Sequence, residues 1–131
     1  MVGAVVAAGL VLATPAGGAL EVRLSTVPAR PVALEPTRVV LRTYLPLLRS
    51  DGTCCRLEPG GPRRYPFRVV AISPSGKTFG VAVQRVRPNV WHGVFRFRAP
   101  GHWQVRVANY DHLGSVLPGA RPRLNVHVSP N

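Results

Sequence analysis

The stretch from 91 to 107, WHGVFRFRAPGHWQVRV, constrains the fold of this chain more than any other. Two runs that alternate bulky apolar and polar residues meet at a Pro-Gly pair. Because successive side chains of a strand point to opposite faces, this pattern predicts two half-buried strands that share an aromatic core. Proline second and glycine third in Ala99-Pro100-Gly101-His102 favour a tight turn between them. The expected inward side chains are Trp91, Gly93, Phe95, Phe97, Trp103, Val105 and Val107.

The same alternation recurs along the rest of the chain, and no segment has the apolar period of a helix. Further strands are expected at 20–24, 38–45, 67–72, 79–83 and 124–128. Only barrel closure or the packing of two sheets buries so many one-sided strands. Seven strands in about 110 residues favour an immunoglobulin-like antiparallel sandwich. The predicted fold class is therefore all-β, behind an N-terminal signal-like segment.

The segment 1–19 has the order of a signal peptide, with an apolar run from 2 to 13 followed by small residues and a proline. No lysine or arginine precedes the run, so an uncleaved N-terminal anchor stays open as an alternative. We therefore expect one domain, residues 20–131, located outside the cytoplasm as a secreted, periplasmic or cell-surface protein.

Residues 46–64 break the alternation and predict a long exposed loop that holds the adjacent Cys54 and Cys55. Neighbouring Cα atoms lie ~3.8 Å apart, below the usual separation across a disulfide. Export favours oxidation of these thiols. The open alternatives are exposed thiols with no role, an interchain disulfide, a redox-sensitive ring between the two, and thiolate ligation of a metal.

The formal net charge is +12, from 17 basic and 5 acidic residues, and every basic residue except Lys77 is arginine. This bias can reflect codon composition as well as a ligand. If their strands are neighbours in one sheet, the outward arginines form a flat cationic face for phosphates, acidic glycans or anionic lipid head groups. Otherwise they are an ordinary solvated surface. Specific nucleic-acid binding is not expected, because the aromatic rings are needed in the core. The candidate anion-binding residues are Arg42, Arg68, Arg96, Arg98 and Arg106.

Neither metal binding nor catalysis has a recognisable motif. The histidines, His92, His102, His112 and His127, match no known ligand spacing, and surface histidines without a role are the expectation. The five carboxylates are dispersed, whereas a glycosidase needs two that face each other across a cleft. No Gly-x-Ser-x-Gly elbow is present to place a nucleophilic serine. We therefore expect no enzyme, no resident metal and no cofactor.

A proline-rich entry at Pro28 precedes a β-branched strand, and Ile72-Ser73-Pro74-Ser75-Gly76 follows it. A strand of F-x-F type and a strand of W-x-V-x-V type then flank a glycine turn. This order of features resembles the small immunoglobulin-like domains of exported bacterial proteins. The resemblance implies an adhesive or spacer module, an accessory domain of an envelope protein or, in some branches, a copper-handling protein. The shared positions are core and turn positions, so the resemblance implies no functional residue.

The sequence therefore predicts an exported, non-catalytic binding or structural module of the cell envelope. Its expected partners are an anionic envelope polymer, lipid head groups or another envelope protein, contacted through the arginine-rich face. The alternative is an exported copper-handling domain that uses Cys54, Cys55 and histidines.

Overall fold

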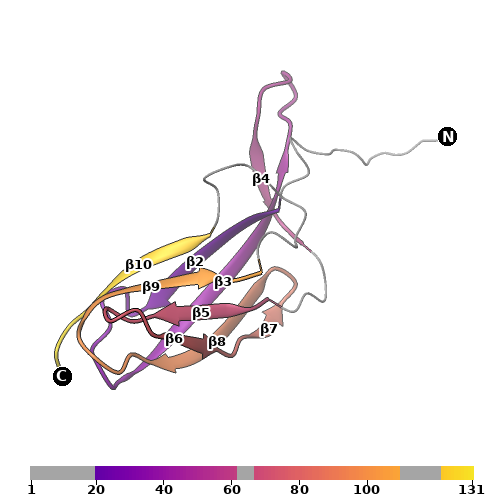
Figure 1. Ribbon diagram of the computed structural model, residues 1–131. Coiled ribbons are helices and arrows are strands. Elements are labelled where there is room, and N and C mark those ends of the chain that lie inside the picture. The colour runs from indigo at the N-terminus through magenta and orange to yellow at the C-terminus, as the bar shows by residue number, and fades with distance from the viewer. Residues whose placement is uncertain (1–19, 62–66, 110–121) are drawn as a thin grey trace.

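The computed structural model describes residues 20–61, 67–109 and 122–131, which contain nine strands and no helix (Figure 1). None of these residues therefore belongs to a helix able to cross a membrane. The strands are β2 (Glu21–Val27), β3 (Pro36–Leu47), β4 (Arg56–Pro59), β5 (Val69–Ile72), β6 (Thr78–Val81), β7 (Gln84–Arg87), β8 (Val90–Arg96), β9 (Gly101–Val107) and β10 (Arg123–Val128).

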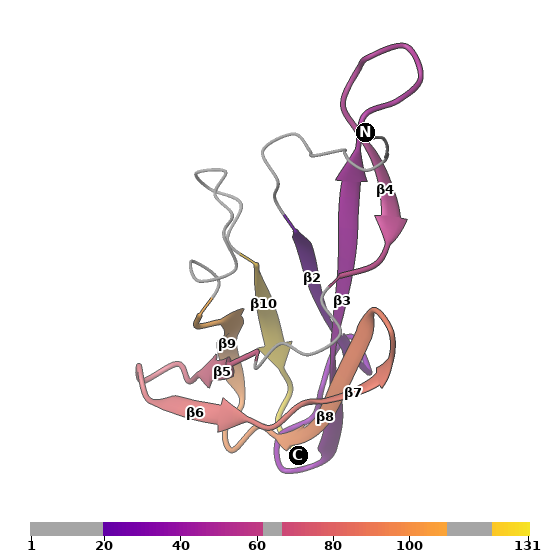
Figure 2. The ribbon, with the colours of Figure 1, turned by 90° about the vertical axis from the view of Figure 1, so that its right-hand side faces the viewer.

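The strands form two antiparallel sheets (Figures 1 and 2). One sheet has the order β10-β9-β5-β6, and the other has the order β2-β3-β8-β7 with β4 paired to the far end of β3. An all-β fold with two antiparallel sheets is confirmed, and it is consistent with a sandwich. The strand number differs from the predicted seven, because the described residues also contain β4 and β7.

Neither additional strand has a buried residue, so apolar alternation could not reveal them. Strand β4 lies inside the stretch predicted as a long loop, 46–64, and β3 extends into that stretch as far as Leu47. The segment without strand structure between them is therefore only 48–55. Together β3 and β4 form a hairpin that projects beyond the other strands (Figures 1 and 2).

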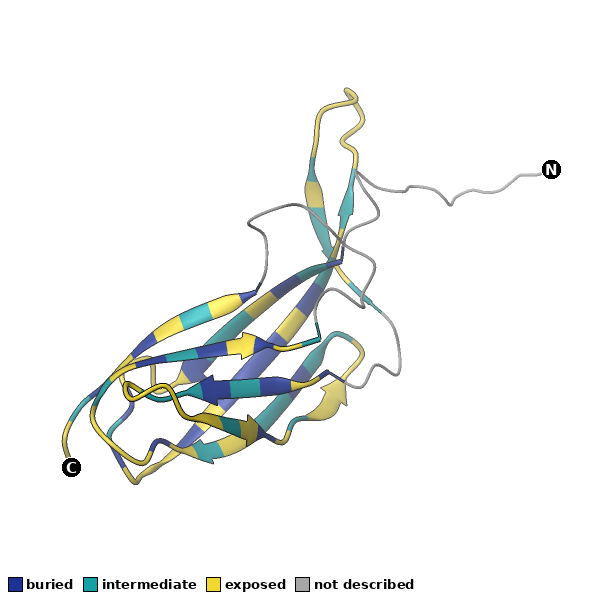
Figure 3. Ribbon diagram, in the orientation of Figure 1, coloured by how far each residue is buried: buried dark blue, intermediate teal, exposed yellow. Residues whose placement is uncertain are grey.

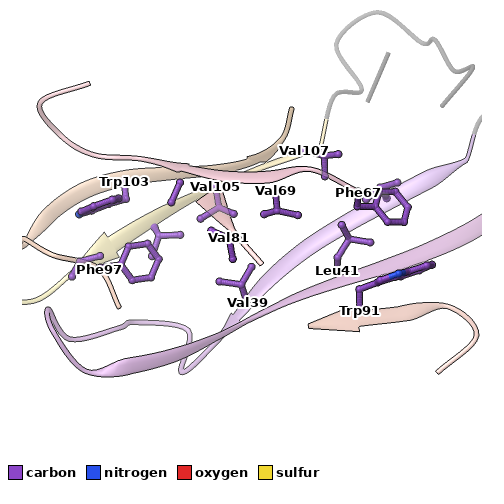
Figure 4. Packing of buried hydrophobic residues seen from close by; sticks show 14 of the residues in the cluster. Val39, Leu41, Phe67, Val69, Val81, Trp91, Phe97, Trp103, Val105 and Val107 are labelled. Atoms are coloured by element: carbon purple, nitrogen blue, oxygen red, sulfur yellow. The ribbon is translucent and has the colours of Figure 1, made fainter. Parts of the chain in front are cut away.

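The core lies between the two sheets and draws on both (Figure 4). In its middle, Val39 and Leu41 of β3 meet Val69 of β5 and Val105 of β9, and none is more than 2% exposed. Aromatic rings occupy the two ends of this core. Phe97 and Trp103 lie at one end, with ring centroids 5.1 Å apart. Trp91 and Phe67 lie at the other end, with centroids 4.7 Å apart.

The predicted interior role of the aromatic residues is confirmed. Trp91 is 4% exposed, Trp103 is 2% exposed and Phe97 is fully buried, whereas Phe95 is half-buried. The indole Nε1–H of Trp103 donates a hydrogen bond to the carbonyl oxygen of Ala99, at 2.8 Å. A buried tryptophan usually needs such a partner for its one polar atom. The one polar atom of the Trp103 ring therefore has a hydrogen-bond partner at the edge of the core.

Gly93 permits the chain to cross from one sheet to the other. The segment that leaves β6 and enters β7 passes so close to β8 that a Cβ on Gly93 would overlap the carbonyl oxygen of Ala82. A glycine inside a strand often marks such a close backbone approach. The connection between the sheets therefore depends on the absence of a side chain at this position.

The outer faces of both sheets alternate with the buried positions, as the banding in Figure 3 shows. One outward residue breaks the pattern. Val40 is only 4% exposed yet lies outside the core cluster, between the neighbouring positions Ser25 and His92. Arg38 and Arg42 flank it on the same strand. Such long side chains cover apolar surface with their stems.

Candidate functional site

The five arginines singled out from the sequence do not share one face. Arg42 of β3 and Arg96 of β8 belong to the sheet that contains β2. Arg106 belongs to β9 in the other sheet, and Arg68 directly precedes β5 beside it. Arg98 follows the end of β8. The condition for one flat cationic surface, that their strands be neighbours in a single sheet, is therefore not met.

On the sheet that contains β2, Arg23 and Arg96 already have partners. Arg23 lies directly opposite Arg42, but its Nε is 3.2 Å from Oε2 of Glu21. The Arg23 guanidinium also lies 5.3 Å from the centre of the Tyr44 ring. Nη1 of Arg96 donates to the carbonyl oxygen of Leu34 at 2.9 Å. Arg96 and the arginine that faces Arg42 therefore already use part of their hydrogen-bonding capacity within the protein.

The other sheet contains a second pair of facing arginines, Arg106 on β9 and Arg123 on β10. Both are exposed, and neither forms an ion pair with any carboxylate of the described residues. They flank a hollow of about 180 Å³ whose remaining lining, among the described residues, is Val107, Ala108 and Pro122. Like charges directly opposite one another destabilise a sheet, so this pair is expected to favour an anion between the two guanidinium groups.

The backbone of Arg68 is bonded to the end of β9 beside this hollow, but Arg68 itself lines a different hollow with residues of β5 and β6. Its carbonyl oxygen accepts a hydrogen bond from the backbone N–H of Ala108, at 2.6 Å, and its own N–H donates to Oδ1 of Asn109, at 2.9 Å. These bonds hold the entry to β5 against the end of β9, next to Arg106. We define the arginine hollow as the site formed by Arg106 and Arg123.

Arg96 and Arg98 line a different surface groove, of about 580 Å³. Its apolar lining comes from Leu34, Val94 and Phe95, and Val94 is 65% exposed. The guanidinium carbon of Arg98 lies 4.9 Å from the centre of the Phe79 ring. This cation–π arrangement occupies the arginine side chain. The groove is therefore more apolar and less available to anions than the arginine hollow.

The adjacent cysteines lie in the loop of the projecting hairpin and are joined to each other by a disulfide. No described cysteine is free. An interchain bridge or thiolate ligation of a metal would therefore require this bond to open. In the same loop, Oδ1 of Asp51 accepts hydrogen bonds from Oγ1 of Thr53 at 2.6 Å and from its backbone N–H at 2.9 Å. These bonds hold the pKa of the Asp51 carboxyl below its usual value.

Two of the histidines form a pair that the sequence patterns did not predict. His102 of β9 and His127 of β10 are directly opposite in the register, both exposed, with ring centroids 5.0 Å apart. His92 lies on the other sheet, and His112 falls outside the described residues. The described residues contain no group of three or more His, Cys, Asp or Glu able to hold a metal ion. The cysteines and histidines of the copper hypothesis are thus not brought together in this part of the chain.

The described carboxylates are spread over separate parts of the fold. Glu21 pairs with Arg23 on β2, and Glu58 pairs with Arg56 on β4 at 3.1 Å. Asp51 lies in the hairpin loop and Glu35 precedes β3, while Asp111 falls outside the described residues. Two of these carboxylates therefore serve as counter-ions to arginine.

One spacing in the sequence could have indicated both facing pairs on this ladder. His102 and Arg106 are related as i and i+4, and so are Arg123 and His127. The register of β9 with β10 places the histidines opposite each other and, at the same spacing, the arginines opposite each other. Any antiparallel register that forms one of these pairs therefore forms the other.

Comparison of the sequence with models of protein families gives no match, and comparison with curated proteins gives none either.

Proposed function

We propose that this protein is a non-catalytic binding module that attaches to anionic polymers or lipid head groups through the arginine hollow. The observation that carries the proposal is the facing pair Arg106 and Arg123, which flanks a hollow and lacks a described carboxylate partner. Guanidinium groups bind phosphate, sulfate and carboxylate through paired hydrogen bonds. A bound anionic group would also relieve the repulsion between the two arginines.

The size of the hollow supports recognition of one charged group rather than a whole small molecule. Its volume is about 180 Å³. Pockets for drug-sized ligands have roughly 300–1,000 Å³. A repeating polymer or a lipid surface presents many such groups. The net charge of +12 adds long-range attraction to any anionic surface, and salt weakens that attraction.

We further propose that the fold is of the immunoglobulin type. With the hairpin strand β4 set aside, the chain order gives strands A, B, C, C′, D, E, F and G as β2, β3, β5, β6, β7, β8, β9 and β10. The two sheets then have the orders A-B-E-D and G-F-C-C′. This matches the division of immunoglobulin domains into an ABED sheet and a sheet built on C, F and G. Such folds commonly serve as binding and spacer modules.

An extracytoplasmic location, either secreted or at the cell envelope, is part of this proposal. The apolar stretch within residues 1–19 supports export.

The proposal is tested by binding to dextran sulfate and, separately, to vesicles with and without an anionic phospholipid. The double substitution Arg106→Gln with Arg123→Gln is expected to weaken binding about 10-fold or more, because each charge-assisted hydrogen bond contributes about 1.5–3 kcal/mol. The matched control is Arg85→Gln with Arg87→Gln, two exposed arginines of β7 in the other sheet. It removes the same charge and is expected to change affinity only about 2-fold at low salt.

Equal losses in the two double variants would show that bulk charge alone drives binding, and the arginine hollow would then not be a site. Binding to neither polymer nor vesicles at low salt would overturn the proposed function altogether. A preference for dextran sulfate over anionic vesicles would assign the ligand to polymers, and the reverse would assign it to lipid head groups.

A further inference from the structure

We propose that His102 and His127 form an exposed two-imidazole site for a divalent d-block metal ion such as Zn²⁺ or Cu²⁺. The site uses neither cysteine and lies apart from the arginine hollow. We infer the site from the register and geometry of the β9–β10 ladder, independently of the proposed anion binding.

The core fixes the placement of the two histidines. His102 and His127 are cross-strand partners in the antiparallel pairing of β9 with β10, and their side chains point away from the core. The neighbouring inward residues Trp103, Val126 and Val128 are all at most 2% exposed. A slip of β10 by one residue would turn Val126 and Val128 outward, and a slip of β9 by one residue would turn Trp103 outward, so burial opposes both slips and supports the register that pairs the histidines.

The separation of the rings suits a shared ion. Two imidazoles bound to one metal ion at about 2.0–2.1 Å, with an N–metal–N angle between about 90° and 109°, have ring centroids about 4.5–5.2 Å apart. The observed separation is 5.0 Å, and the ring planes are inclined by 59°. Both side chains are exposed, so rotation of the rings can direct one nitrogen of each toward a shared ion. The strands already hold the rings at the distance that chelation requires.

The nearest facing arginines are too far away to exclude a cation. Along both strands the next outward positions are Gln104 and Asn125, whose side chains hydrogen-bond at 3.4 Å, and the facing arginines come after them. An i, i+4 spacing along a strand places the arginine pair about 13 Å from the histidine pair. That distance exceeds the Debye length of about 8 Å at physiological ionic strength, so the arginines repel a bound cation only weakly.

The chemical class of the ion follows from the donors. Imidazole nitrogen is a preferred ligand of zinc, copper and nickel, whereas calcium and magnesium prefer oxygen. With only two protein ligands, the remaining coordination positions are open to water or to an external donor. At the same pair of nitrogens Cu²⁺ is expected to bind more tightly than Zn²⁺.

The test is a calorimetric titration of the full chain, disulfide intact, with zinc chloride and separately with copper chloride. We expect one saturable site, and His102→Gln or His127→Gln each to weaken binding at least about 10-fold, because the second imidazole binds intramolecularly. The double variant should bind little worse than either single one. The matched control, His92→Gln on the other sheet, should leave affinity unchanged. Zn²⁺ should also raise the melting temperature of the unaltered protein more than that of the variants.

A rebuilt site makes the test sharper. The starting variant lacks both histidines and also has Arg106→Gln with Arg123→Gln, and Gln104→His with Asn125→His then places a new pair one outward position along the same ladder. The two arginines are removed because they would lie about 7 Å from the new pair, within the Debye length. Binding should return to within about 10-fold of the original affinity, since the new positions face each other in the same way. Failure to regain binding in a folded rebuilt variant would contradict the geometric argument. The proposal would also be overturned by an unaltered protein without saturable binding, or by histidine variants with full affinity.

Discussion

The two halves of β3 contain similar apolar residues but bury them very differently. In the first half, Val39 and Leu41 have no exposed surface. In the second half, Leu45 is 43% exposed, and Leu48 just beyond the strand is 57% exposed. Figure 3 shows the same change along the strand, from the part buried between the two sheets to the projecting hairpin. We call the two packed sheets without this hairpin the body of the protein. Leu41 and Leu45 even have the same parity, so strand alternation alone would place both in the core.

The difference lies in what faces the strand. The first half of β3 pairs with β2 and β8 and also packs against the opposite sheet, whereas the second half near Leu47 pairs with β4. A hairpin of two strands is only marginally stable by itself in water, because it buries little apolar surface. Backbone pairing therefore extends this strand, while side-chain burial stabilises only the part between the sheets.

The largest expected effect on stability is at the end of the core that contains Trp103 and Phe97. Trp103 contacts three phenylalanine rings there, Phe79, Phe95 and Phe97. Trp103→Ala should lower the free energy of unfolding by about 3–5 kcal/mol, because it leaves a large cavity beside these rings. Urea denaturation measures this change. Trp103→Phe is the control, since it keeps an aromatic ring and should cost less. A loss below about 1 kcal/mol in the alanine variant would show that this end of the core is not closely packed.

A matched pair of substitutions on β3 tests the comparison directly. Leu41 is fully buried between the sheets, and Leu41→Ala should cost about 2–5 kcal/mol. Leu45→Ala removes the same atoms at the i+4 position and should cost less than about 1 kcal/mol, because much of that side chain is already in water. Equal losses in urea denaturation would show that the hairpin is packed against something in solution and is not a free projection.

The strands of the body were predictable because their signal is local. Phe97, Trp103 and Val105 are buried, and their alternation with polar neighbours alone indicates it. The order of residues at 73–76, with proline second and glycine fourth, is likewise local and typical of a type I turn, and the Gly76 N–H donates to the Ser73 carbonyl oxygen at 2.9 Å. By contrast, β4 and β7 have no buried side chain to mark them, and they exist because a neighbouring strand offers backbone partners.

The candidate site was harder to predict because it depends on sheet order and register. Alternation placed Arg42 and Arg106 on solvent faces, but only the strand order shows that those faces belong to different sheets. The matching spacings of His102 with Arg106 and of Arg123 with His127 connect the two facing pairs, but only the register places Arg123 opposite Arg106. The pairing of His102 with His127 likewise depends on the register of β9 with β10. Non-local pairing is fixed by the packing of the whole core, so a single segment does not contain that information.

The smallest expected effects concern the two ion pairs of the described residues, one in each region. In the hairpin, Glu58 contacts Arg56, whose side chain is 63% exposed. Glu58→Gln should therefore change the free energy of unfolding by less than about 0.5 kcal/mol. In the body, Glu21 is the counter-ion of Arg23, which lies opposite Arg42. Glu21→Gln should cost somewhat more, about 0.5–1 kcal/mol, because the two arginines then face each other without that carboxylate.

The dependence of the stability loss on salt should distinguish Glu21→Gln from Glu58→Gln. Added salt should reduce the cost of Glu21→Gln in urea denaturation, since it screens the repulsion between the two guanidinium groups. Glu58→Gln exposes no such facing pair, because Glu58 lies opposite Leu45 and Arg56 lies opposite Leu47. Its small cost should therefore respond little to salt. A larger and salt-independent loss for Glu58→Gln would mean that the hairpin depends on its ion pair, and the body and the hairpin would then differ less in electrostatics than in burial.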